Sequence, residues 1–229
     1  MHKRVEKDDQ LIFTKIVGLQ LKKIRLIKGY TQTRVAKAIN ITFQQIQKYE
    51  RGTNEVKSIN LKKLSEYFPE ETSAITNYVG LLNAQSKKQI QIEYAGKLTI
   101  DEENYPGAKI LTRDDAEQVH IEHGGANLWC DKAIHYSKEN FIEAYGNVIL
   151  KQGDTINMTS KYIEYSGITE FAFASGDVVM NDQNSTISSD TLYFDRAKEQ
   201  AYYRSGGNVV KDSSGTITSK IGRYYMNLK

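Results

Sequence analysis

Four side chains of the kinds that bind metal ions lie close together in the second half of the sequence: His120, His123, Cys130 and His135. Imidazole nitrogen and thiolate sulfur are ligands that zinc prefers. His120 and His123 are three positions apart in a strand-like run, so their side chains point to opposite faces of that strand. The spacing also fits none of the usual structural zinc patterns. We therefore expect neither a metal site nor another cofactor.

The other reactive side chains form no recognisable catalytic set. Cys130, the single cysteine, stands beside Trp129 in a strand-like run, where we expect it to be a small buried hydrophobe. The sequence shows no glycine-rich phosphate loop, no Ser/His/Asp set and no paired acid and base. We therefore predict that the protein is not an enzyme.

A different chemistry, hydrogen bonding from the end of a short helix, is indicated in the first half of the sequence. Thr31 is a good N-cap for one helix, and Thr42 is a good N-cap for a second helix over residues 43–49. Between them, Asn40 accepts the left-handed conformation that a tight turn requires. Two short helices joined by such a turn make a helix-turn-helix.

Further helices are expected on both sides of this pair. Apolar residues recur at helical spacing before it, and Gly29 is a natural C-terminal stop after their cationic last turn. The residues that predict a fourth and a fifth helix are Leu61, Leu64 and Tyr67, then Ile75, Val79 and Leu82. The apolar stripe of the fifth helix either mediates dimerisation or packs on the domain's own core.

The segments TQTRVA at residues 31–36 and ITFQQIQKYERG at residues 41–52 resemble the Cro/lambda-repressor-like (XRE) helix-turn-helix family. The resemblance covers about residues 15–68 and implies a five-helix domain that binds double-stranded DNA, commonly as a homodimer. It places the second helix of the motif in the major groove. The DNA-binding residues that it implies are Gln32, Arg34, Thr42, Phe43, Gln44, Gln45, Lys48 and Arg51.

Within that set the resemblance implies distinct roles. Gln44 or Gln45 pairs with adenine, Phe43 faces a thymine methyl group, and Gln32 contacts a phosphate. The alternative is a helix-turn-helix scaffold that never touches DNA, with the glutamines on a solvated face.

The distribution of charge separates the two halves of the chain. Residues 1–80 hold fifteen Lys or Arg against eight Asp or Glu, whereas residues 81–229 hold sixteen against twenty. Such asymmetry suggests a nucleic-acid-binding part beside something unrelated. No apolar run is long enough for a membrane-spanning helix, and the N-terminus has no apolar core of a signal peptide.

The second half contains a repeated module. Gly-Asn-Val at residues 146–148, Gly-Asp-Val at residues 176–178 and Gly-Asn-Val at residues 207–209 recur at intervals of 30 and 31 residues, among short strands and polar turns. Such a period indicates stacked units that bury their apolar faces against one another, in a folded-over sheet of jelly-roll or solenoid character. We expect its interior to be lined by Val148, Leu150, Ile156, Met158, Ile163, Phe171, Phe173, Val178, Met180, Ile187, Leu192 and Phe194.

The segments YAGKL (94–98), PGAKIL (106–111), AYGNV (144–148) and DTLYFD (190–195) resemble the OstA-like/LptA-like family of lipopolysaccharide-transport proteins, in its Bacteroidetes-type form. The resemblance runs over about residues 92–227. It implies a V-shaped β-jellyroll of antiparallel strands whose interior shields the acyl chains of lipopolysaccharide (lipid A), and which extends edge to edge with similar jellyroll domains. The alternative is a closed apolar core that binds no ligand.

These observations predict a helix-turn-helix domain over residues 1–83 and an OstA-like β-jellyroll over residues 84–229. A DNA-binding domain belongs in the cytoplasm and a lipopolysaccharide carrier in the periplasm, so we hypothesise an unusual or artificial fusion with its junction between residues 68 and 85. Three functions stay open: two modules without a joint activity, a cytoplasmic transcription regulator whose β-domain senses a ligand or oligomerises, and an envelope protein with a helical appendage.

Overall fold

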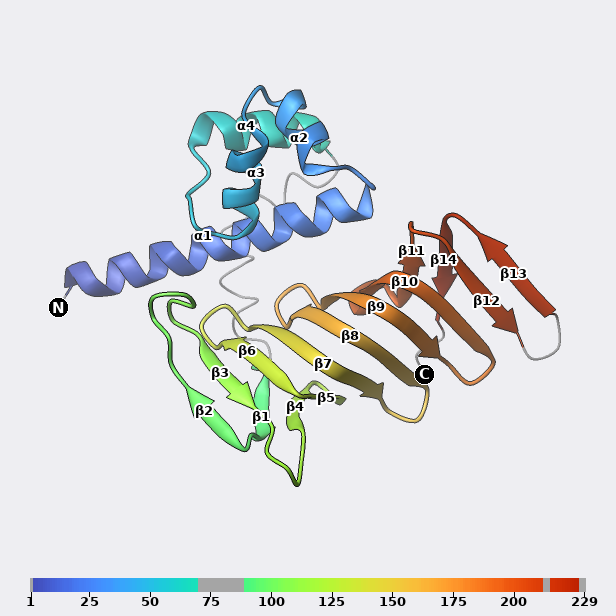
Figure 1. Cartoon of the computed structure of the whole chain (residues 1–229). Helices are drawn as coiled ribbons and strands as arrows, with labels where there is room; N and C mark the ends of the chain where they lie inside the picture. The colour runs from blue at the N-terminus through green and yellow to red at the C-terminus, as the bar shows by residue number, and fades with distance from the viewer. Residues whose placement is uncertain (1, 70–88, 212–214, 227–229) are drawn as a thin grey trace. The chain divides into compact units, whose positions relative to one another are not determined.

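A computed structural model describes residues 2–69, 89–211 and 215–226 of the chain, which divides into two compact units, Met1–Lys87 and Lys88–Lys229 (Figure 1). The described part of the first unit contains four α-helices: α1 (His2–Ile27), α2 (Gln32–Ala38), α3 (Phe43–Glu50) and α4 (Ser58–Tyr67). Five helices were expected; the fifth, through Ile75, Val79 and Leu82, falls on residues 70–88, which lie outside the described residues. None of the helices in the described ranges is long and apolar enough to cross a membrane.

The local signals for the helix-turn-helix are confirmed. Thr31 Oγ1 accepts a hydrogen bond from the backbone N–H of Arg34 at 3.1 Å, and Thr42 Oγ1 accepts one from Gln45 at 3.2 Å. Asn40 adopts a φ of 57°, the left-handed conformation that was expected between α2 and α3. Each cap satisfies a backbone donor that the first turn of its helix would otherwise leave without an acceptor.

The helices of the first unit pack closely. Leu21, Ile46 and Leu64 come from three different helices and are almost completely buried. A Cβ atom added to Gly18 on α1 would lie only 2.1 Å from the carbonyl oxygen of Tyr49 on α3. The backbones of α1 and α3 therefore touch at a point where no larger residue fits.

The second unit is a single antiparallel sheet. Its strands are β1 (Gln91–Tyr94), β2 (Lys97–Thr99), β3 (Lys109–Thr112), β4 (Val119–His123), β5 (Ala126–Cys130), β6 (Lys132–Tyr136), β7 (Phe141–Gln152), β8 (Ile156–Ser166), β9 (Phe171–Asn181), β10 (Ser185–Asp195), β11 (Gln200–Tyr203), β12 (Gly207–Lys211), β13 (Gly215–Ser219) and β14 (Gly222–Tyr225), with a short 3₁₀ helix, η2 (Arg196–Lys198), after β10. The four long strands β7 to β10 lie side by side at its centre (Figure 1).

The sheet folds over because each long strand belongs to two layers. The first layer contains β1, β4, β5, β12 and β13 with one half of each long strand, and the second contains β2, β3, β6, β11 and β14 with the other halves. On β7, for example, β5 pairs with the C-terminal half at Trp129↔Ile149 and β6 pairs with the N-terminal half at Lys132↔Tyr145. The expectation of a folded-over sheet is confirmed in this sense.

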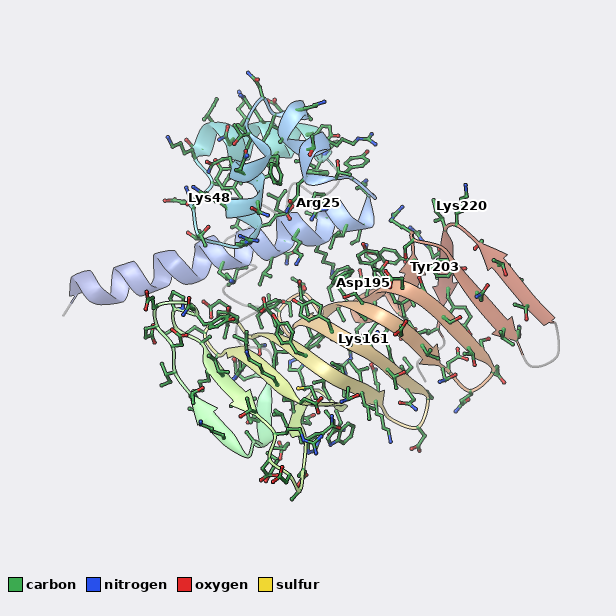
Figure 2. The ribbon with its side chains drawn as sticks, viewed as in Figure 1. Arg25, Lys48, Lys161, Asp195, Tyr203 and Lys220 are labelled. Atoms are coloured by element: carbon green, nitrogen blue, oxygen red, sulfur yellow. The ribbon has the colours of Figure 1, made fainter. Side chains whose placement is uncertain are left out.

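The thirty-residue repeat marks the bend between the layers. The pairing register shifts at Gly146-Asn147 on β7 and at Gly176-Asp177 on β9, and all four residues have positive φ. A Cβ atom on Gly176 would lie 2.8 Å from Cβ of Lys161, the β8 residue at the same bend, which Figure 2 marks. Glycine recurs here because the bulge requires left-handed backbone and a close approach to the next strand.

Candidate functional site

The first turn of α3 is presented to solvent. Phe43 is 40% exposed although it is a large apolar residue, and Thr42 and Gln44 are exposed beside it. Gln45 is half-buried, and Lys48, one turn further along α3, is exposed. These predicted DNA-contacting residues therefore share one accessible helix end, with polar, apolar and cationic groups within two turns.

A buried ion pair holds α3 in this position. Arg25 at the end of α1 donates two hydrogen bonds to the carboxylate of Glu50 at the end of α3, at 2.5 and 2.8 Å, and a third to the carbonyl of Tyr30 at 3.0 Å. Both charged residues are less than a tenth exposed. A bidentate guanidinium–carboxylate pair fixes orientation as well as distance, so the pair determines how α3 is presented. Figure 2 marks Arg25 together with Lys48 of α3.

The other predicted DNA-contacting residues differ in how accessible their polar groups are. Gln32 is half-buried, and its side-chain amide donates to Glu50 at 2.8 Å, so this donor is already used within the protein. Arg34 is exposed, and its guanidinium lies 3.8 Å from the ring centroid of Tyr30. Arg51 is exposed after the end of α3. The charges of Arg34 and Arg51 remain accessible, as a role in phosphate binding requires.

The second candidate site is the space between the two layers of the sheet. One cluster of buried side chains fills it and draws only on residues of the second unit, from Ile90 to Met226. The predicted interior residues that belong to this cluster are Val148, Leu150, Ile156, Met158, Ile163, Val178, Met180, Ile187, Leu192 and Phe194. None of these ten is more than 5% exposed.

The prediction was wrong for Phe171 and Phe173. Side chains alternate along β9, and the inward positions belong to Ala172 and Ala174, which are 1% exposed and part of the cluster. The two phenylalanines lie on the opposite face, with their rings 6.4 and 5.2 Å from that of Tyr193 on β10. Their hydrophobicity suggested the interior, but the alternation of side chains along β9 places the alanines there instead.

On β7 and on the C-terminal half of β9, the inward side chains become larger with distance from the bend. Val148 is followed two residues further along β7 by Leu150, and Val178 is followed on β9 by Met180. A cavity of about 20 Å³ lies among the larger, more distant residues, which include Leu150. It holds about one water in this conformation, so an acyl chain fits only if the layers move apart.

The cavity also has polar walls that sequence reasoning did not identify. Its lining includes His123, Gln152, Tyr165 and Arg196 among apolar residues. Nδ1 of His123 lies 2.8 Å from the hydroxyl oxygen of Tyr165. The signal that would have found them is positional, since all four stand at or next to a strand end at the same side of the sheet.

The side chains that suggested metal binding are dispersed. As expected, His120 and His123 face opposite sides of β4: His120 stacks on Trp129 with ring centroids 4.6 Å apart, whereas His123 is buried beside Tyr165. Burial raises the pKa of the Cys130 thiol to about 12, and burial together with the charge of Lys109 lowers the pKa of His135 to about 4. Within the described ranges, no three His, Cys, Asp or Glu side chains are grouped closely enough to hold a metal ion.

Comparison with protein families matches each unit to a different family. Residues 87–229 match the family described as OstA-like protein, and residues 21–75 match the family described as helix-turn-helix. Helix-turn-helix and OstA-like domains are non-enzymatic kinds of domain. The helix-turn-helix match agrees with the XRE-type resemblance of the sequence and indicates DNA binding in transcription regulation.

Individual relatives match the helical unit. An uncharacterized HTH-type transcriptional regulator of Sinorhizobium medicae (strain WSM419) is 42% identical over 50 residues, which are 22% of this chain and 36% of the relative. Another from Sinorhizobium fredii (strain NBRC 101917 / NGR234) is 34% identical over 71 residues, 28% of this chain and 50% of the relative. The chain therefore spans between about a third and a half of the length of these relatives.

Solved structures show weaker likenesses. LptH of Pseudomonas aeruginosa, described as the LptA homologous periplasmic component of the lipopolysaccharide transport device, is 14% identical with a TM-score of 0.42, over 62% of this chain and 99% of that one. A helix-turn-helix family transcriptional regulator of Vibrio cholerae is 12% identical with a TM-score of 0.30, over 94% of this chain and 86% of that one.

Proposed function

Because the chain belongs to the OstA-like protein family, we propose that its β unit binds the acyl chains of lipopolysaccharide (lipid A) between the two layers of the bent sheet. The observation that supports this function is the continuous apolar cluster between the layers. Transfer of acyl carbons from water into such a space gains about 0.8 kcal/mol per CH₂ group. The same side chains fill the space when no lipid is present, so binding requires the layers to separate.

Similar jellyroll domains are the proposed protein partners of this unit. Among the described strands, β1, β2, β13 and β14 each pair on one side only, and Leu98, Ile217 and Tyr225 on three of them are more than half exposed. Open strand edges with apolar side chains invite strand addition by another sheet. Strand pairing between copies or relatives would extend the apolar interior from one domain to the next.

Lipid binding is tested by displacement of a hydrophobic dye from the full chain by lipid A. Ala126→Phe places a large ring in the wall of the cavity and is expected to lower lipid A affinity at least about tenfold. Ala116→Phe, at an exposed position, is the matched control and should bind like the wild type. If lipid A displaces the dye equally well from both variants, the result would argue for a closed core that binds no lipid there.

For the helical unit we propose sequence-specific binding to double-stranded DNA, with α3 in the major groove. The exposed first turn of α3 supports this function, since it offers the Gln44 amide and the Phe43 ring from a helix held by the Arg25–Glu50 pair. We propose that Gln44 or Gln45 reads adenine, that Phe43 contacts a thymine methyl group, and that Arg34, Lys48 and Arg51 contact the backbone. A homodimer on two half-sites is the proposed assembly.

DNA binding is tested by a mobility shift of random duplex DNA with the full chain at increasing salt. Lys48→Gln is expected to reduce the slope of log K against log salt concentration by about 0.9, since one phosphate contact is lost. Lys62→Gln, an exposed lysine on α4, should leave that slope unchanged. If the two variants behave alike, α3 does not face the phosphates.

A second candidate is a transcription regulator whose β unit senses a ligand or oligomerises, and the match of the helical unit to HTH-type transcriptional regulators favours it. In that case lipid A or another ligand changes DNA affinity in the same assay. If the two activities are independent, the chain is better described as a fusion of two modules, with the junction that we propose between residues 68 and 85. An intact secretory leader in the genomic reading frame upstream of Gln85 would support the fusion.

A further inference from the structure

The two layers of the β unit are joined covalently only along the bend, because β7 to β10 pass through both of them there. On the far side, non-covalent contacts alone connect one layer to the other. Contacts across that side therefore decide whether the interior is open or closed. Hydrogen bonds there join Ile90 to Asn140 and Tyr224 to Asp182. Three polar residues that line the cavity make further contacts: His123, Tyr165 and Arg196.

Arg196 makes one of these cross-layer contacts. It begins η2 at the end of β10 in the second layer, and its guanidinium donates to the carbonyl of His123 at 3.1 Å and to that of Gly124, at the end of β4 in the first layer. These acceptors are neutral carbonyls. A guanidinium binds more strongly to a carboxylate or phosphate, so an anion that reaches this point competes well for it.

His123 and Tyr165 make another cross-layer contact. Nδ1 of His123 on β4 is 2.8 Å from the hydroxyl of Tyr165 on β8, and the two residues are 6% and 8% exposed. Burial raises the pKa of Tyr165 to about 12, with Arg196 acting in the opposite direction, so the phenol stays protonated and available as a hydrogen-bond donor at neutral pH. Close to both, within the part of the chain that the structure describes, Oε1 of Gln152 is buried without a hydrogen-bond partner.

We infer that His123, Tyr165 and Arg196 form a clasp that gates the interior, and that opening it frees Arg196 to bind the anionic head group of the amphiphile whose alkyl chain enters. The inference rests on the proposed lipid-binding function. An apolar cavity bordered by a cation that lacks a carboxylate among its hydrogen-bond acceptors, and by the unsatisfied Gln152 oxygen, suits a ligand with one alkyl chain and a charged end.

The experiment measures binding of two fluorescent probes to the full chain by stopped flow: cis-parinaric acid, which is anionic, and the corresponding uncharged alcohol. Tyr165→Phe removes one cross-layer hydrogen bond and keeps the ring. It is expected to speed association of both probes about fivefold, the effect of one neutral hydrogen bond. Tyr225→Phe, at a position 64% exposed, is the matched control and should leave both rates unchanged.

The head-group role of Arg196 is tested by the ratio of the two affinities. Arg196→Gln is expected to reduce the preference for the acid over the alcohol by about tenfold or more, because a charge-assisted contact is lost. Arg196→Lys should retain most of the preference, which separates loss of charge from loss of folding. Arg223→Gln, on the exposed side of β14, removes the same charge elsewhere and should change nothing.

The outcomes distinguish the clasp from the lipid function. If the wild type binds both probes but Tyr165→Phe leaves the rates unchanged and Arg196→Gln keeps the preference for the acid, the clasp is refuted while lipid binding stands. If neither the wild type nor the variants bind either probe, lipid binding itself is refuted and the clasp with it. Faster association of Tyr165→Phe and a lost preference in Arg196→Gln support the gate.

Discussion

Gly176→Ala is expected to weaken the bend of the β unit, and Gly153→Ala provides a matched control. Both glycines have positive φ, 78° and 54°, so alanine at either position adopts a left-handed conformation that costs roughly 1 to 2 kcal/mol. At Gly176 the added Cβ would also lie 2.8 Å from Cβ of Lys161, whereas at Gly153 it meets nothing within 4 Å. Cβ of Lys161 cannot move without its backbone, so relief of this contact costs roughly a further 1 to 3 kcal/mol.

The difference between the two variants isolates the close approach at the bend. Urea unfolding of the full chain can be followed by the fluorescence of Trp129, the single tryptophan, which lies on β5 and therefore reports the β unit. With an m-value of about 2 kcal/mol/M, a difference of about 2 kcal/mol lowers the midpoint of Gly176→Ala by about 1 M relative to Gly153→Ala. Equal midpoints for the two alanine variants would refute the claim that close packing at the bend, rather than φ alone, requires glycine.

Three further outcomes are expected. Glu50→Gln leaves Arg25 buried without its anionic partner and should destabilise the helical unit by about 3 to 5 kcal/mol, measured as an earlier loss of helical circular dichroism in urea. His135 has a folded pKa of about 4, below its unfolded value of about 6.5. The unfolded state therefore binds more protons, and the free energy of unfolding falls as the pH is lowered between these values. His135→Leu should remove up to about 3 kcal/mol of this loss, measured by urea unfolding at several pH values, and the same pH dependence in the variant would contradict the assignment. Cys130, buried with a thiol pKa of about 12, should react with iodoacetamide at pH 8 roughly a thousandfold more slowly in the folded protein than in urea, and fast labelling of the folded protein would show that β5 is not buried as described.

Local signals in the sequence predicted local structure well. Thr31 and Thr42 are caps, and Asn40 is left-handed, because a cap or a tight turn depends on a few adjacent residues. The glycine repeat likewise predicted a regular sheet module, since β7 and β9 bend with the same left-handed backbone at Gly146 and Gly176. The families expected from the quoted motifs match both parts of the chain.

Features that depend on partners distant in sequence were missed. Phe171 and Phe173 were assigned to the interior by hydrophobicity, and only the pairing of β9 with its neighbours shows that Ala172 and Ala174 face inward. The contact between His123 and Tyr165 joins residues 42 positions apart, so no short motif announces it. The DNA-contacting residues stay predictions, although the contact of Gln32 with Glu50 shows that one of them also has a structural role.

The bend and the clasp together imply a direction for lipid entry. Moving away from the bend in the second layer, Ile163 is followed on β8 by Tyr165, and Leu192 is followed on β10 by Phe194. The trend also holds on β7 and in the C-terminal half of β9. It does not hold for Ala174 and Ala172 on β9 or in the N-terminal halves of β8 and β10. Where larger side chains fill the space between the layers, a ligand displaces the most side-chain volume and gains the most apolar contact. The bend is closed by continuous strands, so separation of the layers proceeds from the clasp inward. On the proposed function, we therefore expect a lipid held in this unit to have its head group at the side of Arg196 and its chain directed towards the bend.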